Sequence, residues 1–247
     1  MFDLTGRVAL VTGAGRHVGR AIAEALAARG AAVAVNDVVA DRARAVAEAI
    51  VKTGGRALAA PADMTDRAAV SAMVAEVEAG LGPVDVLVSN AGNAGATQAV
   101  PTAFADMDPK DWPKYVDVNF YAVLNGIHAV LPGMRARHFG RIITIASDAG
   151  RQGLAMGMSI YSGGKAAAMG FQRSLACEVG CDQITVNTVS LGMIPGDWDA
   201  GPVRGTPMGR HGVPKDVGPA VVYFASDEAS WTTGQILSVN GGVYRNV

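Results

Sequence analysis

The sequence predicts a single α/β domain in which a mostly parallel sheet is covered by helices on both faces, a doubly wound arrangement. Short apolar segments typical of buried strands alternate along the chain with longer segments rich in alanine, leucine and glutamate, which favour helices. Glycine-containing turns separate these segments, and no linker, low-complexity tract or fixed-period repeat interrupts them. We therefore expect one domain over residues 1–247, built from repeated strand–helix units.

The individual elements follow from residue type and from the glycines that end them. Seven apolar segments are expected to form a seven-stranded sheet, at residues 7–12, 32–36, 57–60, 84–89, 141–146, 184–189 and 235–239. Helices are expected at residues 20–29, 41–53, 67–79, 112–131, 159–179 and 216–225. Residues 193–210 hold four glycines and three prolines, so we expect an irregular flap there.

Composition excludes several classes of function. The formal net charge is -1 and no basic tract is present, so we expect no nucleic-acid binding. The first residues lack the features of a signal peptide, and no apolar run approaches the roughly 20 residues that span a bilayer. We expect a soluble, cytoplasmic protein without membrane contact. Cys177 and Cys181 could hold half a metal site, but reduced, partly buried thiols are the better interpretation, so no metal is expected.

The turn after the first strand is the leading candidate for a cofactor site. Its glycines, Gly13, Gly15 and Gly19, would let the backbone approach a pyrophosphate, and the next helix would offer unpaired N–H groups to it. The spacing differs from the G-x-G-x-x-G fingerprint, and tight strand–helix packing is the alternative explanation.

Asp37, at the end of the second strand, indicates which dinucleotide would bind. Its carboxylate could accept hydrogen bonds from an adenine ribose diol, although a surface turn or a helix cap would also explain it. At about 4 Å from a 2′-phosphate it would cost on the order of 1 kcal/mol in water and about 4 at an effective dielectric of 20. Arg16 argues for NADP, but the position of Asp37 favours NAD over NADP.

A candidate acid–base pair lies near the start of the helix expected at 159–179. Tyr161 and Lys165 are four residues apart and therefore share a helix face. A nearby ammonium would lower the pKa of the phenol and make it a plausible general acid and base, although an ordinary surface pair has the same spacing. Ser147 directly follows a buried strand, where a hydroxyl could bind a substrate oxygen or merely cap a loop.

In combination and in order, these segments resemble the short-chain dehydrogenase/reductase family over nearly the whole chain, which implies a Rossmann-like fold. The matching motifs are T12-G-A-G-R-H-V-G19, A62-D63-M64, S89-N-A-G92, V118-N119, the set Ser147, Tyr161 and Lys165, and G234-Q-I-L-S-V-N-G-G242. The resemblance implies a nicotinamide-dependent oxidoreductase that interconverts a secondary alcohol and a ketone.

The resemblance also implies roles for single residues. Tyr161 would donate or remove the proton, Lys165 would tune Tyr161 and hold the nicotinamide ribose, and Ser147 would orient the substrate oxygen. Asn119 would position a water that links Lys165 to solvent. The residues expected to contact the cofactor are Gly13, Gly15, Arg16, His17, Val18, Gly19, Asp37, Asp63, Met64, Asn90, Ala91, Gly92, Tyr161, Lys165, Gly192 and Ile194.

Three positions depart from the family pattern. His17 stands where the family usually has a glycine, and its Cβ could crowd the pyrophosphate or its ring could help to bind it. Leu191 replaces a proline, and Gly196 stands where a threonine often lies. The flap is also short, which favours an open substrate cleft.

The substrate is predicted less closely. Candidate lining residues at 93–97, 148–158 and 193–198 indicate an apolar, adaptable pocket, although core packing or a subunit interface would also explain them. The segments 128–134 and 145–149 are similar to those of reductases of acyl thioesters and cyclic hydroxy acids. We expect an apolar cyclic or acyl-chain hydroxy compound, such as a coenzyme A thioester.

Two other classes of function and the assembly state stay open. A catalytically silent NAD-binding sensor or scaffold would keep the fold, and a methyltransferase would keep a glycine-rich loop. The resemblance further implies a homo-oligomer that pairs the helices at 112–131 and 159–179 and the last strand, as a dimer or a tetramer.

Overall fold

The computed structural model describes residues 1–92, 102–153, 157–196, 201 and 205–244. Its seven strands form one sheet in the order β3-β2-β1-β4-β5-β6-β7, and every neighbouring pair is parallel. The strands are β1 Val8–Val11, β2 Ala32–Val35, β3 Arg56–Ala59, β4 Val86–Ser89, β5 Gly140–Ser147, β6 Ile184–Leu191 and β7 Ile236–Val239. The prediction of one doubly wound, seven-stranded sheet is confirmed, and the sheet is wholly rather than mostly parallel.

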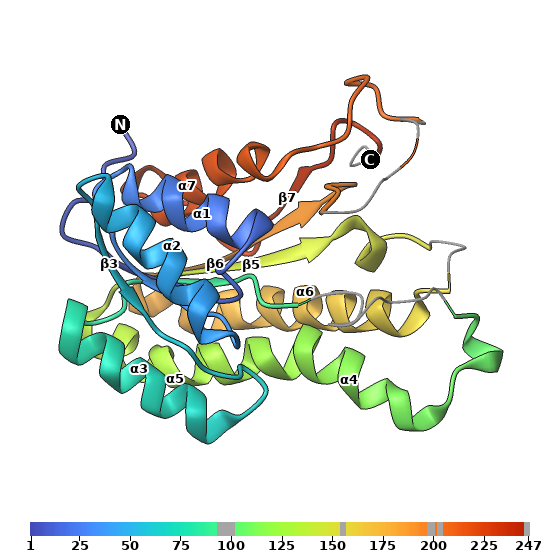
Figure 1. The fold of residues 1–247 in the computed structure, drawn as a ribbon, viewed down its shortest axis with the longest axis horizontal. Coiled ribbons are helices and arrows are strands. Elements are labelled where there is room, and N and C mark those ends of the chain that lie inside the picture. The colour runs from blue at the N-terminus through green and yellow to red at the C-terminus, as the bar shows by residue number, and fades with distance from the viewer. Residues whose placement is uncertain (93–101, 154–156, 197–200, 202–204, 245–247) are drawn as a thin grey trace.

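Helices cover both faces of the sheet, as Figure 1 shows. The helices are α1 His17–Ala27, α2 Ala40–Lys52, α3 Arg67–Leu81, α4 Trp112–Val116, α5 Ala122–Arg137, α6 Ser159–Val179 and α7 Gly218–Ala225. Helices α1, α2 and α7 lie on one face and α3, α5 and α6 on the other (Figure 1). Among the described helices, none is long and apolar enough to cross a membrane.

The apolar runs of the strands serve two hydrophobic clusters, one on each face. In β1, Ala9 and Val11 belong to the cluster under α1, α2 and α7, whereas Val8 and Leu10 belong to the cluster under α3, α5 and α6. Successive strand residues point to opposite faces, so a strand buried on both sides must be apolar throughout. This explains why the strands are continuous apolar segments rather than alternating ones.

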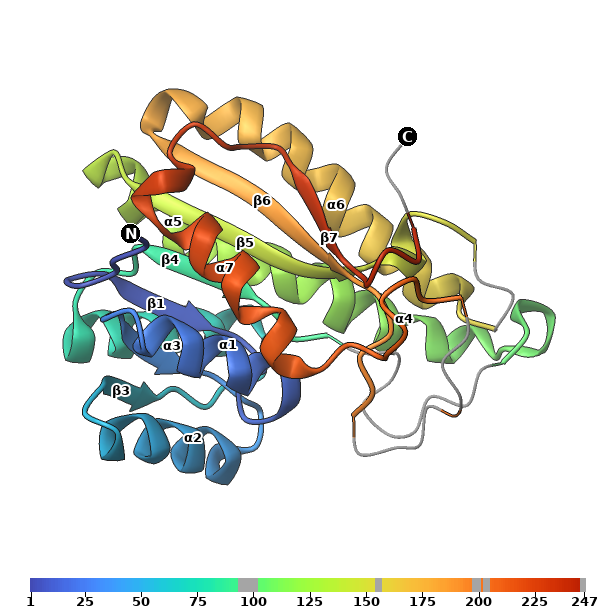
Figure 2. The ribbon, with the colours of Figure 1, turned by 90° about the horizontal axis from the view of Figure 1, so that it is seen from above.

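The connections between strands change from one side of the sheet to the other between β1 and β4. Strand β1 lies between β2 and β4, so the connections leave β1 and β4 toward opposite sides of the sheet. In Figure 2 the strands run toward one end of the molecule, where α4 and the segment after β6 also lie. Crevices at the carboxyl ends of strands at such a switch point are the usual binding sites of doubly wound folds.

Two predicted elements differ from the structure in detail. The helix expected at 112–131 is α4, a π-helical turn at Asp117–Tyr121, and α5, which continues to Arg137. The helix expected at 216–225 begins at Gly218, after a short 3-10 turn at Pro214–Asp216. In the described parts of the predicted flap, at 193–196, 201 and 205–210, no helix or strand is present.

Candidate active site

The predicted phosphate-binding turn is fastened to the end of β4. The Asn90 side-chain amide donates to the carbonyl oxygens of Thr12 and Gly13 at 2.9 and 3.0 Å. In return, Thr12 Oγ1 accepts from the backbone N–H groups of Asn90 and Ala91 at 3.0 and 2.9 Å. The structure therefore brings together two segments, 13–19 and 90–92, that were predicted to bind the cofactor but lie far apart in the sequence.

Glycines in this turn permit contacts that any side chain would block. A Cβ on Gly19 would lie 2.2 Å from the carbonyl oxygen of Gly13, and a Cβ on Gly13, where φ is +60°, would lie 2.9 Å from Cα of Ala91. The packing explanation offered for these glycines is thus correct at both positions. It does not exclude phosphate binding, because glycines at these positions let the backbone at the start of α1 approach a ligand closely, while the N–H groups of Gly13 and Gly15 themselves donate to Asn36 and Asp37.

His17 adopts a backbone conformation that explains why a glycine is usual there. Its φ is +47°, in the left-handed region that costs a non-glycine residue about 1–2 kcal/mol. Helix α1 begins at His17, with the exposed Arg16 before it and the partly buried Val18 after it. His17 is therefore the first residue of the helix whose N-terminal N–H groups are expected to meet the pyrophosphate.

Two residues that follow β2, Asn36 and Asp37, also form hydrogen bonds with the turn at 13–19. Asp37 is buried, and its carboxylate accepts from the backbone N–H groups of Gly15 at 3.1 Å and Val39 at 2.9 Å. Asn36 accepts from the Gly13 N–H at 3.3 Å and donates to the carbonyl oxygens of Ala60 and Ala62 at 3.0 and 3.1 Å. The sequence reasoning missed Asn36, although a buried-strand end with two successive polar residues was a usable signal.

Arg42 is a second residue that the sequence reasoning missed. A Cβ on Gly15 would lie 2.6 Å from Cβ of Arg42 and 2.6 Å from Oδ2 of Asp37. Arg42 is exposed and lies on the first turn of α2. The Arg42 side chain therefore begins close to the carboxylate that was expected to select the cofactor.

The segment predicted to meet the adenine lies after β3. Asp63 is exposed, and its Oδ1 accepts from the backbone N–H and the hydroxyl of Thr65, both at 2.8 Å. Met64 is buried in the core, and its carbonyl oxygen accepts from the Asn125 amide at 3.0 Å. An adenine contact at Met64 would therefore be made by its backbone N–H, since the side chain packs inward.

Ser147, Tyr161 and Lys165 come together at the carboxyl end of β5. Ser147 ends β5, and its Oγ accepts from the Ala149 N–H at 3.2 Å. Tyr161 and Lys165 lie in the first two turns of α6, where the Tyr161 hydroxyl makes a hydrogen bond with the Ser147 side chain. Lys165 is buried, and its Nζ donates to the carbonyl oxygen of Ile145 at 3.1 Å.

Asn119 joins this group through the π-helical turn. Its side-chain amide donates to the Tyr115 carbonyl oxygen at 2.9 Å. A Cβ on Gly92, where φ is +152°, would lie 2.8 Å from Lys165 Nζ and 2.9 Å from Asn119 Oδ1. Gly92, Asn119 and Lys165 therefore lie close together. A π-helical turn such as the one that carries Asn119 is frequent at functional sites.

Burial changes the proton affinities of the pair on α6. Burial raises the pKa of the Tyr161 phenol, and the hydrogen bond with Ser147 opposes that rise. Burial also lowers the pKa of Lys165 to about 8. The expectation that the Lys165 ammonium lowers the phenol pKa is therefore wrong for this structure, because desolvation of the phenolate is the dominant effect.

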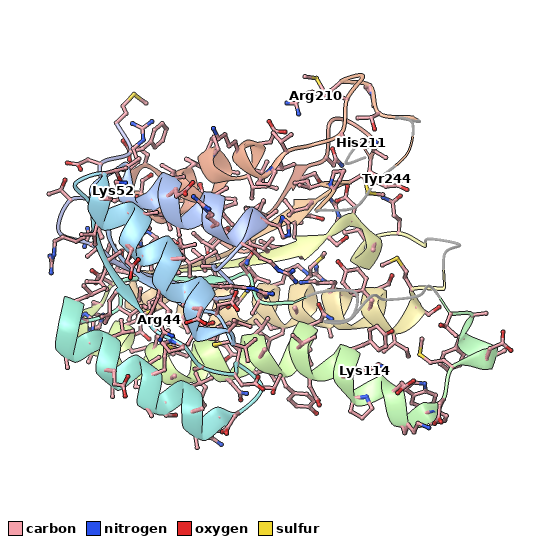
Figure 3. The ribbon with its side chains drawn as sticks, in the orientation of Figure 1. Arg44, Lys52, Lys114, Arg210, His211 and Tyr244 are labelled. Carbon is pink, nitrogen blue, oxygen red and sulfur yellow. The ribbon has the colours of Figure 1, made fainter. Side chains whose placement is uncertain are left out.

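A cavity of about 340 Å³ lies between the flap and the segment after β7. Met193, Ile194, Met208 and Val239 give it apolar walls, and Arg210, which is paired with Asp216 at 2.6 Å, lines its polar side. Figure 3 shows Arg210, His211 and Tyr244 at this end of the molecule. The cavity begins directly after Gly192, one of the predicted cofactor residues.

The remaining predicted positions divide between packing and the undescribed segments. Gly192 donates to Val239 at 3.1 Å, and a Cβ there would lie 2.8 Å from Cα of Asn240. Leu191 and Ile194 pack against the core, and Asp148, expected to line the pocket, is 3% exposed. The predicted lining residues at 93–97, 154–156 and 197–198 lie outside the described residues.

Both cysteines differ from expectation. Cys177 and Cys181 are free and exposed, not partly buried: Cys177 lies in the last turn of α6, and Cys181 lies in the 3-10 turn Gly180–Asp182 that follows it. Within the ranges that the structure describes, no group of three or more histidine, cysteine, aspartate or glutamate side chains could hold a metal ion.

Comparison with known proteins defines the class of this protein. A family model for short chain dehydrogenases matches residues 7–201. The chain is 37% identical over 250 residues to the 3-oxoacyl-[acyl-carrier-protein] reductase FabG of Escherichia coli, covering 98% of this chain and 99% of the relative. The chain belongs to the short-chain dehydrogenase/reductase family. It is an NAD(P)-dependent oxidoreductase that acts on CH–OH and keto groups, which excludes the methyltransferase alternative.

Two solved structures show how far the similarity extends. A 7α-hydroxysteroid dehydrogenase complexed with NADH and 7-oxo glycochenodeoxycholic acid has a TM-score of 0.90 at 35% identity, covering 98% of this chain and 95% of that chain. A gluconate 5-dehydrogenase from Burkholderia cenocepacia, in complex with NADP and tartrate, has a TM-score of 0.91 at 30% identity, covering 100% and 98%. Since these two structures hold different cofactors and different ligands, the cofactor and the substrate class of this protein have to be inferred from its own residues.

Proposed function

We propose that this protein interconverts the ketone and the secondary alcohol of an apolar cyclic or acyl-chain compound, such as a coenzyme A thioester, with NAD as the preferred cofactor. The observation that carries the proposal is the meeting of Ser147, Tyr161 and Lys165 at the carboxyl end of β5. A hydroxyl, a phenol and a buried amine at one sheet edge form an acid–base site that needs no metal.

The residues present fit a nicotinamide dinucleotide. Gly13, Gly15 and Gly19 carry no side chain at the points where the backbone of the turn packs most closely. Lys165 and Asn119 bound the space in front of Gly92. Gly13, Gly15 and Gly19 would hold the pyrophosphate, Asp37 the adenosine ribose, and Lys165 the nicotinamide ribose. When bound, the nicotinamide ring supplies the carbon that gives or takes a hydride.

The chain's own residues would handle the proton. In the reducing direction the Tyr161 hydroxyl donates its proton to the carbonyl oxygen of the substrate, and in the oxidising direction the phenolate accepts it from the alcohol. Ser147 donates a hydrogen bond to the same substrate oxygen. Lys165, with a pKa of about 8, exchanges protons near neutral pH, and Asn119 connects it to solvent.

The cofactor preference rests on the end of β2. The Asp37 carboxylate accepts from Gly15 and Val39, and each of its oxygens has a further lone pair for a ribose hydroxyl. A 2′-phosphate would meet this buried negative charge. Arg16 and Arg42 favour the phosphate, but both are exposed and screened by solvent, so their attraction is weaker.

The substrate class rests on the cavity beside Gly192. Its methionines, Met193 and Met208, are flexible apolar side chains that adapt to rings and acyl chains alike. The similarity to a 3-oxoacyl reductase and a hydroxysteroid dehydrogenase supports acyl-chain and cyclic substrates. The similarity to a gluconate dehydrogenase supports the polar alternative, which the experiment below includes.

The test is a substrate panel read by nicotinamide absorbance. Acetoacetyl-CoA, a 7-oxo bile acid and 5-ketogluconate are offered with NADH and with NADPH. Turnover of either of the first two with NADH supports the proposal, whereas turnover of 5-ketogluconate alone contradicts it. Tyr161→Phe should abolish turnover yet keep cofactor binding in a thermal-shift titration. If the wild type binds NADH and turns over none of the panel, a silent sensor becomes the better description.

We further propose that the chain forms a dimer or a tetramer. Strand β7 is an edge of the sheet, Leu237 on it is 40% exposed, and the nearby Trp231 is 100% exposed. An exposed sheet edge with apolar side chains favours pairing with a second copy. Light scattering after size exclusion tests this, and the mass of a monomer would contradict it. The cytoplasmic location stays a prediction from the sequence.

A further inference from the structure

A buried carboxylate directly follows the candidate catalytic serine. Asp148 is 3% exposed and begins a 3-10 turn, Asp148–Gly150, at the end of β5. Its Oδ1 accepts from the Ser190 hydroxyl at 2.6 Å, and its Oδ2 accepts from the Asn240 amide at 2.7 Å. A buried carboxylate is retained only when hydrogen bonds compensate its lost hydration. Asp148 thus ties the end of β5 to the ends of β6 and β7.

The turn that Asp148 begins also touches the catalytic helix. A Cβ on Gly150 would lie 2.9 Å from the backbone nitrogen of Ala166 and 3.0 Å from the carbonyl carbon of Lys165, so the turn packs directly on α6. A second bond, from Arg151 to the Ser238 hydroxyl at 2.5 Å, fastens the turn to β7. Movement of this turn would therefore change the position of Ser147 relative to α6.

We propose that Asp148 is a positioning residue that holds Ser147 at hydrogen-bonding distance from Tyr161. Asp148 acts through Ser147 and does not touch the substrate, since its two oxygens face Ser190 and Asn240 inside the protein. The inference rests on the proposed function, because the position of Ser147 matters to turnover only if Ser147 and Tyr161 bind the substrate oxygen.

The first experiment replaces Asp148 with asparagine. The variant has one carbonyl oxygen in place of two carboxylate oxygens, so it can accept from Ser190 or from Asn240 but not from both. We expect kcat for the substrate found in the panel to fall by about 10- to 100-fold, as for a misplacement near 1 Å. The Kd of NADH should change less than threefold, because Asp148 does not line the turn at 13–19.

Asn187→Ala is the matched control. Asn187 lies on β6 and, like Asp148, makes two bonds to the β7 region, from its amide to Thr232 at 2.7 Å and from the Gln235 N–H at 3.1 Å. It lies at the opposite end of β7 from Ser147. This variant should lower Tm as much as Asp148→Asn does while leaving kcat near that of the wild type. Equal loss of kcat in the two variants would mean a merely structural role.

Exchange of the two groups provides a rescue. In the double variant Asp148→Asn with Asn240→Asp, the amide at 148 donates to the carboxylate at 240, so the bond is restored in reverse. The carboxylate at 240 also keeps the bond from the Gly242 N–H, which is 2.9 Å in the wild type, but it loses the bond that the Asn240 amide donates to the Tyr244 carbonyl oxygen at 3.0 Å. We expect the double variant to recover part of the kcat that Asp148→Asn loses and to exceed Asn240→Asp alone, and kcat no higher than that of either single variant would overturn the pairing argument.

Hydrogen exchange separates this inference from the proposed function. Peptides that cover residues 147–151 should exchange faster in Asp148→Asn than in the wild type and in Asn187→Ala. This readout needs no substrate, so failure of the wild type to turn over the panel sinks the proposed function alone. Unchanged exchange in this segment, or unchanged kcat in Asp148→Asn, would overturn the role given to Asp148.

Discussion

Two adjacent glycines on α6 should respond in opposite ways to the same substitution. A Cβ on the exposed Gly163 has no heavy atom within 4 Å, whereas a Cβ on the buried Gly164 would lie 3.1 Å from Cβ of Asn119. Alanine is more favourable than glycine inside a helix by about 0.8–1.0 kcal/mol. We expect Gly163→Ala to stabilise the protein by about 1 kcal/mol, which is about 2–4 °C in Tm for a chain of this size.

Gly164→Ala gains the same helix propensity but must move the π-helical turn. The contact with Asn119 is a few tenths of an ångström too short, and the Tyr115 carbonyl oxygen lies 3.6 Å from the new Cβ. Overpacking of this kind costs about 1–3 kcal/mol, so Tm should stay level or fall by a few degrees. Because Asn119 moves with the turn, kcat should fall by about tenfold or more.

Thermal unfolding and steady-state kinetics on the two variants test this pair. The helix, the residue types and the neighbouring catalytic side chains are the same, so the only difference is the space in front of each glycine. An equal rise of Tm in both variants, with kcat unchanged, would refute the reasoning that α6 and the π-helical turn are in tight contact at Gly164.

Two further predictions concern charge. Burial lowers the pKa of Lys165 from 10.5 to about 8, so the unfolded chain binds more protons between these values and stability rises with pH across them. Lys165→Met should therefore be more stable than the wild type at pH 7. The gain in the free energy of unfolding should be at most roughly 3 kcal/mol, reduced by the loss of the hydrogen bond to Ile145. Urea denaturation should show this difference shrinking toward pH 10, and a difference that does not change with pH would contradict the reasoning. Asp37→Asn, which keeps an acceptor for Gly15, should improve NADPH binding relative to NADH by about tenfold in fluorescence titrations, and an unchanged ratio would assign the selection to Arg16 or Arg42.

Much of the fold was predictable because its requirements are local. A parallel sheet buried on both faces needs short apolar strands, and its covering helices need a different composition. The helix at 159–179 has the predicted bounds for this reason. The π-helical turn at 117–121 was not predictable, because the apolar pattern passes through it without a break and only the contact with Gly164 and Gly92 distinguishes it.

The candidate site was predictable where residues end strands and not where they bond to distant partners. Ser147 and Asn90 could be placed at one edge because the carboxyl ends of parallel strands share it. The partners of Asn36 and Asp148, such as Ala62 and Asn240, could not be predicted, since only the folded sheet brings them together. A polar residue at a strand end is a signal for such a role, but it does not name the partner.

The spacing of Tyr161 and Lys165 fixes only that they share a face, and a buried polar contact decides which way that face turns. Gln172 lies seven residues after Lys165 on the same face of α6 and is 2% exposed. Its amide donates to the Thr144 hydroxyl on β5, and its carbonyl oxygen accepts from the Thr188 hydroxyl on β6 at 2.9 Å. Because a buried amide without partners would cost about 1–3 kcal/mol, rotation of α6 about its axis is opposed by both bonds. The helix is therefore held with Lys165 toward Ile145 and Tyr161 toward Ser147, which an apolar face alone would permit but not require.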